Sequence, residues 1–319
     1  MHTVLVTGAA GFVGSSLCAA LRARGAQVHA AVRSRRSSDD GDTFAVGDID
    51  GDTDWRAALA GCDCVVHLAA RVHVLHDSSA DPLALYRRVN VEASVALARQ
   101  AAAMGVKRFV FVSSIKVNGE ASSGAPFRAS DPARPLDPYG QSKLEAETAL
   151  RAVAADTGMA LVIVRPPLVY GPGVKANFLQ LIKLVARGWP LPFGSVRNAR
   201  SMVALPNLVD LLLLCTRDAR AAGAVLLVSD GRDLTIGELA TLIGRAMGQR
   251  VRLLPVPVRL MRAGAALLGK RALAQRLLGS LQVDIGATCE RLDWHPPVSV
   301  ETAIAATVAA WREQPGPPA

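Results

Sequence analysis

The sequence predicts an α/β protein built on a doubly wound parallel sheet, with a smaller C-terminal α/β lobe. Two observations lead to this prediction. Short apolar segments alternate with helical patterns through the first half of the chain, which is typical of successive βαβ units. The first apolar segment leads directly into a glycine-rich turn and then into a helical pattern. We therefore expect residues 1–170 to form the main domain and residues 171–319 to form mainly the lobe, with some later segments returning to the main domain.

The segments expected as strands are short and apolar, and right-handed crossovers should place them side by side and parallel. They cover residues 3–6, 28–32, 43–46, 64–67, 109–113 and 160–165. The helical patterns between them run to residue 24 and then cover residues 55–59, 83–104 and 138–155. Later helical patterns, separated by proline-rich loops and a strand at 224–228, cover residues 177–187, 208–217, 236–247 and 258–278. This second part should cover the carboxyl edge of the sheet, where ligands of such folds bind.

The glycine-rich turn reads TGAAGFVG and lies between the first strand and the first helix. In this context Gly8 allows a tight turn, Gly11 lets the backbone approach a pyrophosphate, and Gly14 permits close packing of the helix on the strand. The unpaired N–H groups of the helix N-terminus, at Phe12 and Val13, would face the phosphates. The pattern predicts a Rossmann-type domain that binds a dinucleotide.

The residues after the second strand bear on which dinucleotide is favoured. An NAD site normally has an acid there that holds the ribose hydroxyls, whereas Arg33 begins the run Arg-Ser-Arg-Arg in this chain. Arginines suit the 2′-phosphate of NADP(H), which is therefore favoured. NAD(H) remains the alternative, because Asp39 or Asp40 could fold back toward the ribose. Asp48, followed by Ile49, could place a carboxylate beside the adenine amino group, and a solvated loop aspartate is the competing interpretation.

A tyrosine and a lysine four residues apart, Tyr139 and Lys143, lie at the start of the helical pattern at 138–155. Asp137 is a suitable N-cap and Pro138 a suitable first helical residue, so the pair would share one face of the first turns. An adjacent ammonium favours the phenolate. We therefore expect it to lower the pKa of Tyr139, so that the phenol can act as a general acid or base near neutrality. The alternative is a surface helix whose tyrosine and lysine only cover neighbouring apolar groups.

Composition narrows the classes of partner. The formal net charge of +9 suits anionic ligands such as phosphates, while an aromatic content of only 4% argues against nucleic-acid binding. The five cysteines have no metal or disulfide spacing, and neither a signal peptide nor an apolar stretch long enough to span a bilayer is evident. We expect a reduced, cytoplasmic protein without a metal or a transmembrane segment. Residues 258–278 alternate basic and apolar side chains and could lie on a membrane surface, but packing on their own domain is favoured.

Several motifs together indicate a family. They are TGAAGFVG, His67-Leu68-Ala69-Ala70, Ser113-Ser114, Tyr139 with Lys143, and the run RPPLVYG that starts at Arg165. On these residues the chain resembles the extended short-chain dehydrogenases/reductases, and more narrowly the NAD-dependent epimerase/dehydratase group that acts on nucleotide-diphosphate sugars. The resemblance covers essentially the whole chain, with the motifs in the family's order.

The resemblance implies a role for each matching residue. Tyr139 would exchange a proton with a sugar hydroxyl or carbonyl, and Lys143 would lower the pKa of that tyrosine and bond the nicotinamide ribose. Ser114 would donate a hydrogen bond to the same sugar oxygen, and Asn90 would lie near the cofactor. The remaining cofactor contacts would come from other residues of the matching motifs, namely Leu68, Ala69, Ala70 and Pro166.

The resemblance also implies a UDP-sugar site in the lobe. Asn177 and Arg200 match positions that hold the diphosphate, and Phe193 begins a Phe-Gly segment that matches the one packing against uracil. A guanidinium suits a diphosphate because it can donate two parallel hydrogen bonds; an ordinary surface arginine is the alternative for Arg200. The phosphate motif usual late in epimerases is not evident, and Arg276 is the candidate substitute.

One departure from the family pattern narrows the reaction. Where the sugar 4,6-dehydratases of the group carry Thr-Asp-Glu, this chain has Ser114-Ile115-Lys116. Elimination of water would then lack its acid and base, so a dehydratase is disfavoured. Asn118 also stands where the family usually has tyrosine, which affects the shape of the sugar pocket.

The main functional expectation is an NAD(P)-dependent oxidoreductase that reduces the 4-keto group of a UDP-linked (N-acetyl)hexosamine for surface-polysaccharide synthesis. The alternative is a 4-epimerase of a UDP-sugar or of a polyprenyl-diphosphate sugar, because both reactions use the same residues. A non-catalytic NADP-binding regulator is a remote third interpretation. The resemblance further implies a homodimer, formed through the helices expected at 83–104 and 138–155.

Overall fold

The structure is a computed structural model that describes residues 2–35, 41–72, 81–122, 124–267, 269 and 271–313. Its centre is a sheet of seven parallel strands: β1 (Thr3–Thr7), β2 (Gln27–Val32), β3 (Thr43–Ala45), β4 (Cys64–His67), β5 (Arg108–Val112), β6 (Ala160–Arg165) and β9 (Val225–Leu227). Their order is β3-β2-β1-β4-β5-β6-β9, with parallel pairing throughout. The predicted doubly wound sheet is confirmed. The strand order reverses between β1 and β4, which is where such sheets bind their ligands.

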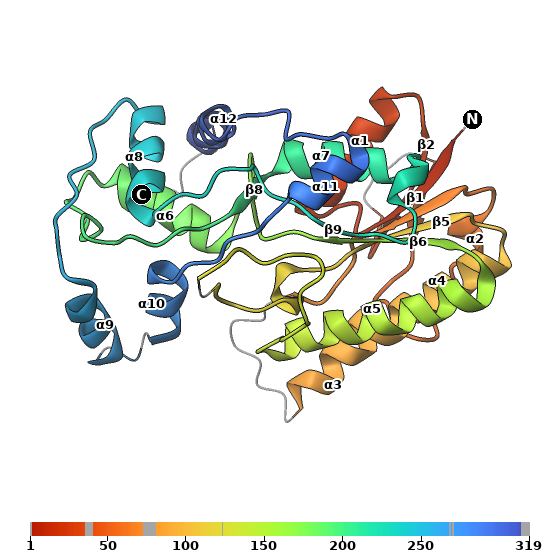
Figure 1. Cartoon of the computed structure of the whole chain (residues 1–319). Coiled ribbons are helices and arrows are strands. Elements are labelled where there is room, and N and C mark those ends of the chain that lie inside the picture. The colour runs from red at the N-terminus through yellow and green to blue at the C-terminus, as the bar shows by residue number, and fades with distance from the viewer. Residues whose placement is uncertain are drawn as a thin grey trace.

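Helices cover both faces of this sheet. α1 (Phe12–Ala23) and α7 (Leu205–Cys215) pack on one face, and α4 (Ala93–Ala103) and α5 (Pro138–Thr157) pack on the other. In Figure 1 the first pair lies above the sheet and the second pair below it. β1 and β4 are buried along their whole length, because a sheet covered on both faces needs apolar residues at consecutive positions. Further helices of this part are α2 (Arg56–Leu59), α3 (Pro82–Arg87) and α11 (Gly286–Leu292).

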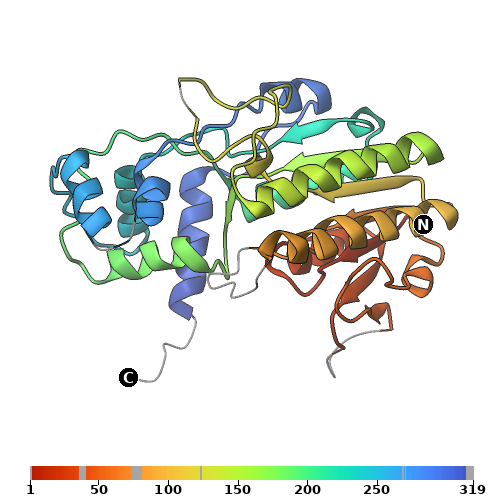
Figure 2. The same ribbon diagram turned by 90° about the horizontal axis from the view of Figure 1, so that it is seen from below.

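The smaller lobe has its own core around a pair of parallel strands, β7 (Leu168–Tyr170) and β8 (Met202–Ala204). α8 begins with a capping box in which Thr235 and Glu238 bond each other's backbone N–H groups. The helices of the lobe are α6 (Ala176–Ala186), α8 (Ile236–Ala246), α9 (Val258–Leu267), α10 (Arg271–Leu278) and α12 (Val300–Glu313). α9 and α10 lie at the end of the molecule away from the large sheet, as the two views in Figures 1 and 2 show.

Four segments show in more detail what the sequence expectation left open. The helix expected at 83–104 is interrupted, because a π-helical stretch, Arg88–Glu92, separates α3 from α4. The strand expected at 224–228 is β9, which extends the large sheet beyond β6, and α7 packs on α1. These two elements are later segments that return to the main domain. The helix expected at 258–278 consists of two helices, α9 and α10.

Candidate active site

The predicted tyrosine–lysine pair lies in the first two turns of α5. The carboxylate of Asp137 accepts a hydrogen bond from the backbone N–H of Gly140 at 2.7 Å, and Pro138 is the first helical residue, so the predicted cap is confirmed. Lys143 is only 2% exposed, and its Nζ lies 4.1 Å from the centroid of the Phe111 ring on β5. The lysine is therefore inside the molecule, and the alternative of a surface helix does not apply.

Ser114 reaches the same place from the end of β5. Its side chain is hydrogen-bonded to that of Tyr139. Its Oγ also accepts a hydrogen bond from the backbone N–H of Lys116 at 3.2 Å, which caps the short 3₁₀ turn Ile115–Val117. The ring of Tyr86, from α3, meets the ring of Tyr139 edge-on with 6.1 Å between centroids. The three residues predicted to be catalytic thus lie together where β5 ends and α5 begins.

Lys116 ties the 3₁₀ turn to the helix that carries the tyrosine. Its ammonium group contacts the carboxylates of Asp137 and, at 3.0 Å, of Glu120. A Cβ added at Gly140 would lie 2.9 Å from the carbonyl oxygen of Lys116, so the turn and the helix touch through their backbones. Ile115 is buried. The two positions that the resemblance matches to the dehydratase acids therefore hold a core residue and a structural cation, a role for Lys116 that sequence reasoning missed.

Burial sets the pKa values of the tyrosine and the lysine. It raises the pKa of Tyr139 to about 12; the hydrogen bond from Ser114 opposes this rise and the charge of Asp137 adds to it. Burial lowers the pKa of Lys143 to about 7, against the attraction of Glu147. The expected fall in the pKa of Tyr139 is therefore wrong for this structure, because the dry site disfavours the phenolate and the ammonium alike. A cation placed beside the phenol would act in the opposite direction.

The glycine turn has the shape that a dinucleotide pyrophosphate needs. Gly8 has a φ of +65°, and a Cβ added at Gly14 would lie 2.2 Å from the carbonyl oxygen of Gly8. Gly11 is the N-cap of α1, whose first turn has neither a side-chain cap nor an acidic residue. The helix N-terminus at Phe12 and Val13 therefore presents backbone N–H groups that lack intrahelical acceptors. These residues fit the phosphates of a dinucleotide.

A cavity of about 670 Å³ lies beside this turn, a volume within the range of small-molecule sites. Arg33 and Asp48 both line it, and the Nε of Arg33 lies 2.8 Å from the carboxylate of Asp48. Both side chains are mostly exposed to solvent. Asp39 and Asp40 lie outside the described residues. Three further predicted cofactor residues line the cavity: Ile49, Ala69 and Ala70.

A buried chain of hydrogen bonds supports this end of the sheet. The Oγ1 of Thr7 lies 2.7 Å from Nδ1 of His67 and accepts hydrogen bonds from the backbone N–H groups of Leu68 and Ala69, each at 3.1 Å. The Nε2 of His67 lies 2.9 Å from the Oγ of Ser94, whose own proton goes to a main-chain carbonyl. Because the Ser94 proton is already used, Nε2 of His67 donates to Ser94. Because Thr7 already accepts two hydrogen bonds, its hydroxyl donates to Nδ1. The imidazole ring therefore carries one proton and is neutral. Burial lowers the pKa of His67 to about 3, in keeping with this arrangement.

Asn90 and Pro166 form hydrogen bonds that connect segments around the site. The side chain of Asn90 accepts a hydrogen bond from the backbone N–H of Arg71 at 2.8 Å and donates one to the Oγ of Ser142 at 2.9 Å. It thereby links the loop after β4 to helix α5. The carbonyl of Pro166 accepts a hydrogen bond from the backbone N–H of Ile115 at 3.0 Å, which holds the turn that follows Ser114.

The three residues predicted to bind the substrate have different surroundings in the lobe. Asn177 is exposed near the start of α6. Phe193 is 7% exposed and belongs to the core of the lobe. The Nη1 of Arg200 donates a hydrogen bond to the carbonyl of Gly279 at 3.2 Å, and burial lowers the pKa of this guanidinium. The side chain of Arg276 lies outside what the structure describes. The binding roles of these residues stay predictions.

Similar proteins agree with this arrangement. Residues 4–229 match the NAD dependent epimerase/dehydratase family. A UDP-glucose 4-epimerase of Vibrio cholerae is 47% identical over 312 residues, which is 97% of this chain and 95% of the relative. The N-acetyl-alpha-D-glucosaminyl-diphospho-ditrans,octacis-undecaprenol 4-epimerase of Escherichia coli O157:H7 is 29% identical over 214 residues, 66% of this chain and 63% of the relative.

A solved structure extends the similarity to three dimensions. MoeE5 in complex with UDP-glucuronic acid and NAD has a TM-score of 0.77 and 27% sequence identity, and the match covers 98% of this chain and 100% of that one. In this chain the cavity lies beside the glycine turn, and Ser114 bonds Tyr139 at the start of the helix that also carries Lys143. The chain therefore belongs to the NAD-dependent epimerase/dehydratase family, a group of extended short-chain dehydrogenases/reductases.

Proposed function

We propose that the protein is an NAD-dependent 4-epimerase of a UDP-linked hexose. The observation that carries this proposal is the similarity to the UDP-glucose 4-epimerase of Vibrio cholerae, which extends over nearly the full length of both chains. The proposal reverses the order of the two sequence expectations and places epimerisation before reduction. Residues 115 and 116 also support it, because neither offers the carboxylate that a 4,6-dehydratase would need.

Two observations favour NAD over NADP as the cofactor. The similar MoeE5 structure contains NAD. In this chain the guanidinium of Arg33, the predicted partner of a 2′-phosphate, already forms an ion pair with Asp48. An epimerase also regenerates its cofactor in each turnover, so it does not draw on the cell's reductant NADPH. We therefore place NADP(H) second.

The chemistry divides between the cofactor and the protein. A dinucleotide held at the glycine turn would supply the hydride acceptor and hydride donor that C4 of the sugar needs. In the first half of the reaction Tyr139 acts as the phenolate, which positive charge beside it favours against burial, and takes the proton of the C4 hydroxyl. In the second half the phenol returns this proton, so Tyr139 ends each turnover in its starting state. Ser114, whose hydroxyl is hydrogen-bonded to Tyr139 in this structure, would turn its single proton to the same sugar oxygen and hold that oxygen within reach of the phenol. Lys143 supplies positive charge beside the tyrosine and hydroxyl-binding capacity for the ribose.

The substrate would be held by the lobe. Arg200 and Asn177 are proposed to bind the diphosphate and the segment at Phe193 to pack against the uracil. The low exposure of Phe193 supports contact through the segment's backbone and neighbouring groups rather than through an open ring face. The half-buried guanidinium of Arg200 suits an anion, because a partly desolvated charge gains more from an opposite charge than an exposed one does.

The test compares two classes of substrate, hydroxyl sugars and a 4-keto sugar. Purified protein is incubated with UDP-glucose or UDP-N-acetylglucosamine without added cofactor, and separately with a UDP-linked 4-keto-6-deoxy sugar plus NADPH. We expect NMR to show interconversion of the C4 epimers, with no net change in nicotinamide absorbance. Turnover of the keto sugar alone, with stoichiometric loss of NADPH, would instead establish a reductase.

The proton carrier is tested with a matched pair of variants. Tyr139→Phe should reduce turnover by roughly 10²–10⁴-fold, the usual contribution of a positioned acid–base group, while dinucleotide binding persists. Tyr86→Phe removes the same hydroxyl from the neighbouring ring and should keep its activity. An active Tyr139→Phe enzyme would show that another group moves the proton.

A further inference from the structure

Helix α9 presents two different faces. None of its residues is fully buried, although Val258 and Met261 pack against the core of the lobe. Leu260 and Leu267 are 64% and 89% exposed. Positions seven apart on an α-helix lie only about 20° from each other around the axis, so these two leucines share one outer face. The favoured sequence interpretation, in which this segment packs on its own domain, therefore holds only for the inner face.

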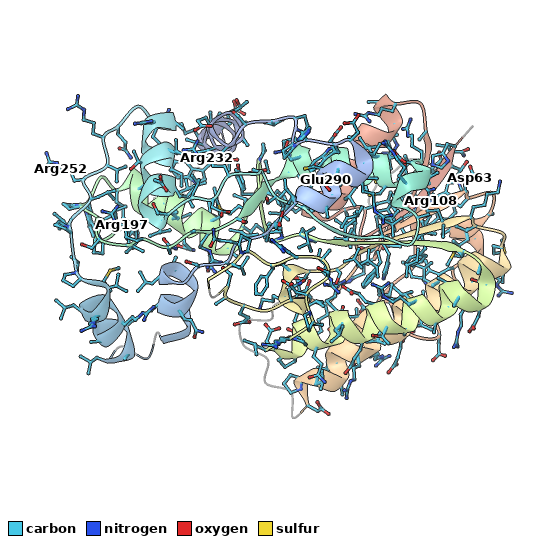
Figure 3. All side chains as sticks on the ribbon, in the orientation of Figure 1. Asp63, Arg108, Arg197, Arg232, Arg252 and Glu290 are labelled. Atoms are coloured by element: carbon cyan, nitrogen blue, oxygen red, sulfur yellow. The ribbon has the colours of Figure 1, made fainter. Side chains whose placement is uncertain are left out.

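The chain around α9 has a strong excess of positive charge. Between Glu238 and Asp284 the sequence contains eight lysines and arginines and no acidic residue, within a chain whose net charge is +9. Figure 3 shows one of these side chains, Arg252, at the outer edge of the lobe. Among those whose side chains the structure describes, all are exposed: Arg245, Arg250, Arg252, Arg259 and Arg262. The positive charges of this stretch are thus nearly equal in number to the net charge of the whole chain.

The segment that leads into α9 continues this surface. Leu254 is 48% exposed. The backbone of Leu191 bonds that of Arg252 and of Leu254, each at 2.8 Å, which brings the chain around Trp189 next to this segment. Trp189 is 64% exposed, and tryptophan is one of the two residues enriched at membrane–water boundaries. We define the basic apolar surface by six residues: Arg252, Leu254, Arg259, Leu260, Arg262 and Leu267.

We propose that the basic apolar surface docks on an anionic phospholipid bilayer. The leucines would enter the headgroup region while the arginines face lipid phosphates, as in amphipathic helices that lie in the membrane plane. A second copy of this chain is a poor occupant, because two surfaces without acidic residues repel each other. A nucleic acid would pair with the arginines and leave the leucines in water. Within the described part of the chain no helix combines the length and the hydropathy needed to cross a bilayer, so the contact is peripheral.

The location links the surface to the substrate lobe without depending on the proposed reaction. α9 packs against α10, and α10 ends next to Gly279, whose carbonyl accepts the hydrogen bond from Arg200. Docking would therefore hold the lobe that carries the predicted diphosphate residues at the membrane surface. Epimerase activity in solution and binding to vesicles are separate measurements, so either can fail alone.

The test is co-sedimentation of the full chain with vesicles. We expect the protein to pellet with phosphatidylcholine vesicles that contain phosphatidylglycerol, to stay in solution with phosphatidylcholine alone, and to bind less as salt rises. The double variant Leu260→Gln/Leu267→Gln and the double variant Arg259→Gln/Arg262→Gln should each lower the vesicle partition coefficient by about tenfold or more. All four side chains are exposed, so circular dichroism should show unchanged folding.

Control variants remove groups of the same kinds elsewhere on the surface. Met104→Gln, at the end of α4, removes an exposed apolar side chain, and Arg99→Gln/Arg151→Gln removes two exposed arginines from α4 and α5. Both controls should pellet as the wild type does. Wild-type protein that stays in the supernatant with anionic vesicles would overturn the proposal. So would binding that is insensitive to the leucine variants but is displaced by RNA, which would identify a site for nucleic acid.

Discussion

Lys143 is buried in a site that disfavours its charge, so its presence should lower the stability of the fold. Its pKa falls from 10.5 to about 7, chiefly because burial removes the ammonium from water, and Glu147 only partly opposes this fall. Methionine has a similar length and no charge. We expect Lys143→Met to abolish turnover and yet to stabilise the protein, which would make this lysine a case of stability given up for activity.

The sign and the size follow from proton linkage. Between pH 7 and pH 10.5 the unfolded chain keeps a proton on Lys143 that the folded protein has released, so wild-type stability rises with pH across this window. The fall from 10.5 to about 7 is about 3.5 units, and each unit corresponds to about 1.4 kcal/mol. Lys143 should therefore destabilise the fold by up to about 5 kcal/mol near neutral pH. At pH 9 this destabilisation should be smaller by about 2 kcal/mol.

The assay is urea denaturation of cofactor-free protein at pH 7 and at pH 9, followed by circular dichroism. The advantage of Lys143→Met over the wild type should be largest at pH 7 and should shrink at pH 9. Lys107→Met, which removes an exposed lysine just before β5, is the matched control and should show no such dependence. A Lys143→Met protein that is less stable than the wild type at pH 7, or whose advantage does not change with pH, would refute the reasoning from burial.

Four further predictions concern the supporting residues. Gly14→Ala should abolish dinucleotide binding in calorimetry, because its Cβ would lie 2.2 Å from a carbonyl oxygen. Glu147→Gln should cost about 3–5 kcal/mol in urea denaturation, because it leaves Arg165 buried without its carboxylate. Wild-type stability should fall as the pH drops from 6.5 toward 3, since His67 binds a proton in the unfolded chain and stays neutral in the folded protein. In unfolding midpoints measured at several pH values, His67→Gln should reduce this dependence of stability on pH. Asp48→Asn should raise the affinity for NADP relative to NAD by up to about fivefold in binding titrations, because breaking an exposed ion pair frees Arg33 at a cost of at most about 1 kcal/mol.

Local rules were sufficient where the site depends on neighbours in the chain. The cap at Asp137, the proline after it and the four-residue spacing of tyrosine and lysine are all short-range features, and the structure has them as predicted. The glycine turn is equally local, because each glycine is needed for a backbone conformation or a close backbone contact within a few residues. The alternation of apolar strands and helices likewise predicted the parallel sheet.

Long-range contacts account for what the sequence did not predict. The spacing of Tyr139 and Lys143 does not reveal that both side chains are buried away from water, and this burial decides the direction of both pKa shifts. The tie between Lys116 and Asp137 joins residues 21 positions apart, and no local pattern pairs them. Asn90 lies in the π-helical stretch and bonds a different loop and α5, and periodicity does not encode these contacts. Phe193 is apolar in sequence, and only packing shows that it belongs to the core.

The surroundings of Glu147 explain why the lysine beside it remains easy to deprotonate. Oε1 of Glu147 accepts hydrogen bonds from Ser113 at 2.5 Å and from Nε of Arg165 at 2.8 Å, and Oε2 accepts from Nη2 of Arg165 at 2.5 Å. The carboxylate is thus neutralised by a buried guanidinium and can favour the ammonium of Lys143 only through space. A carboxylate bonded directly to Lys143 would hold its charge permanently and occupy its donors. Glu147 is instead paired with Arg165, so this carboxylate does not occupy the N–H donors of Lys143. The charge of Lys143 can therefore respond to a phenolate or a ligand placed next to it.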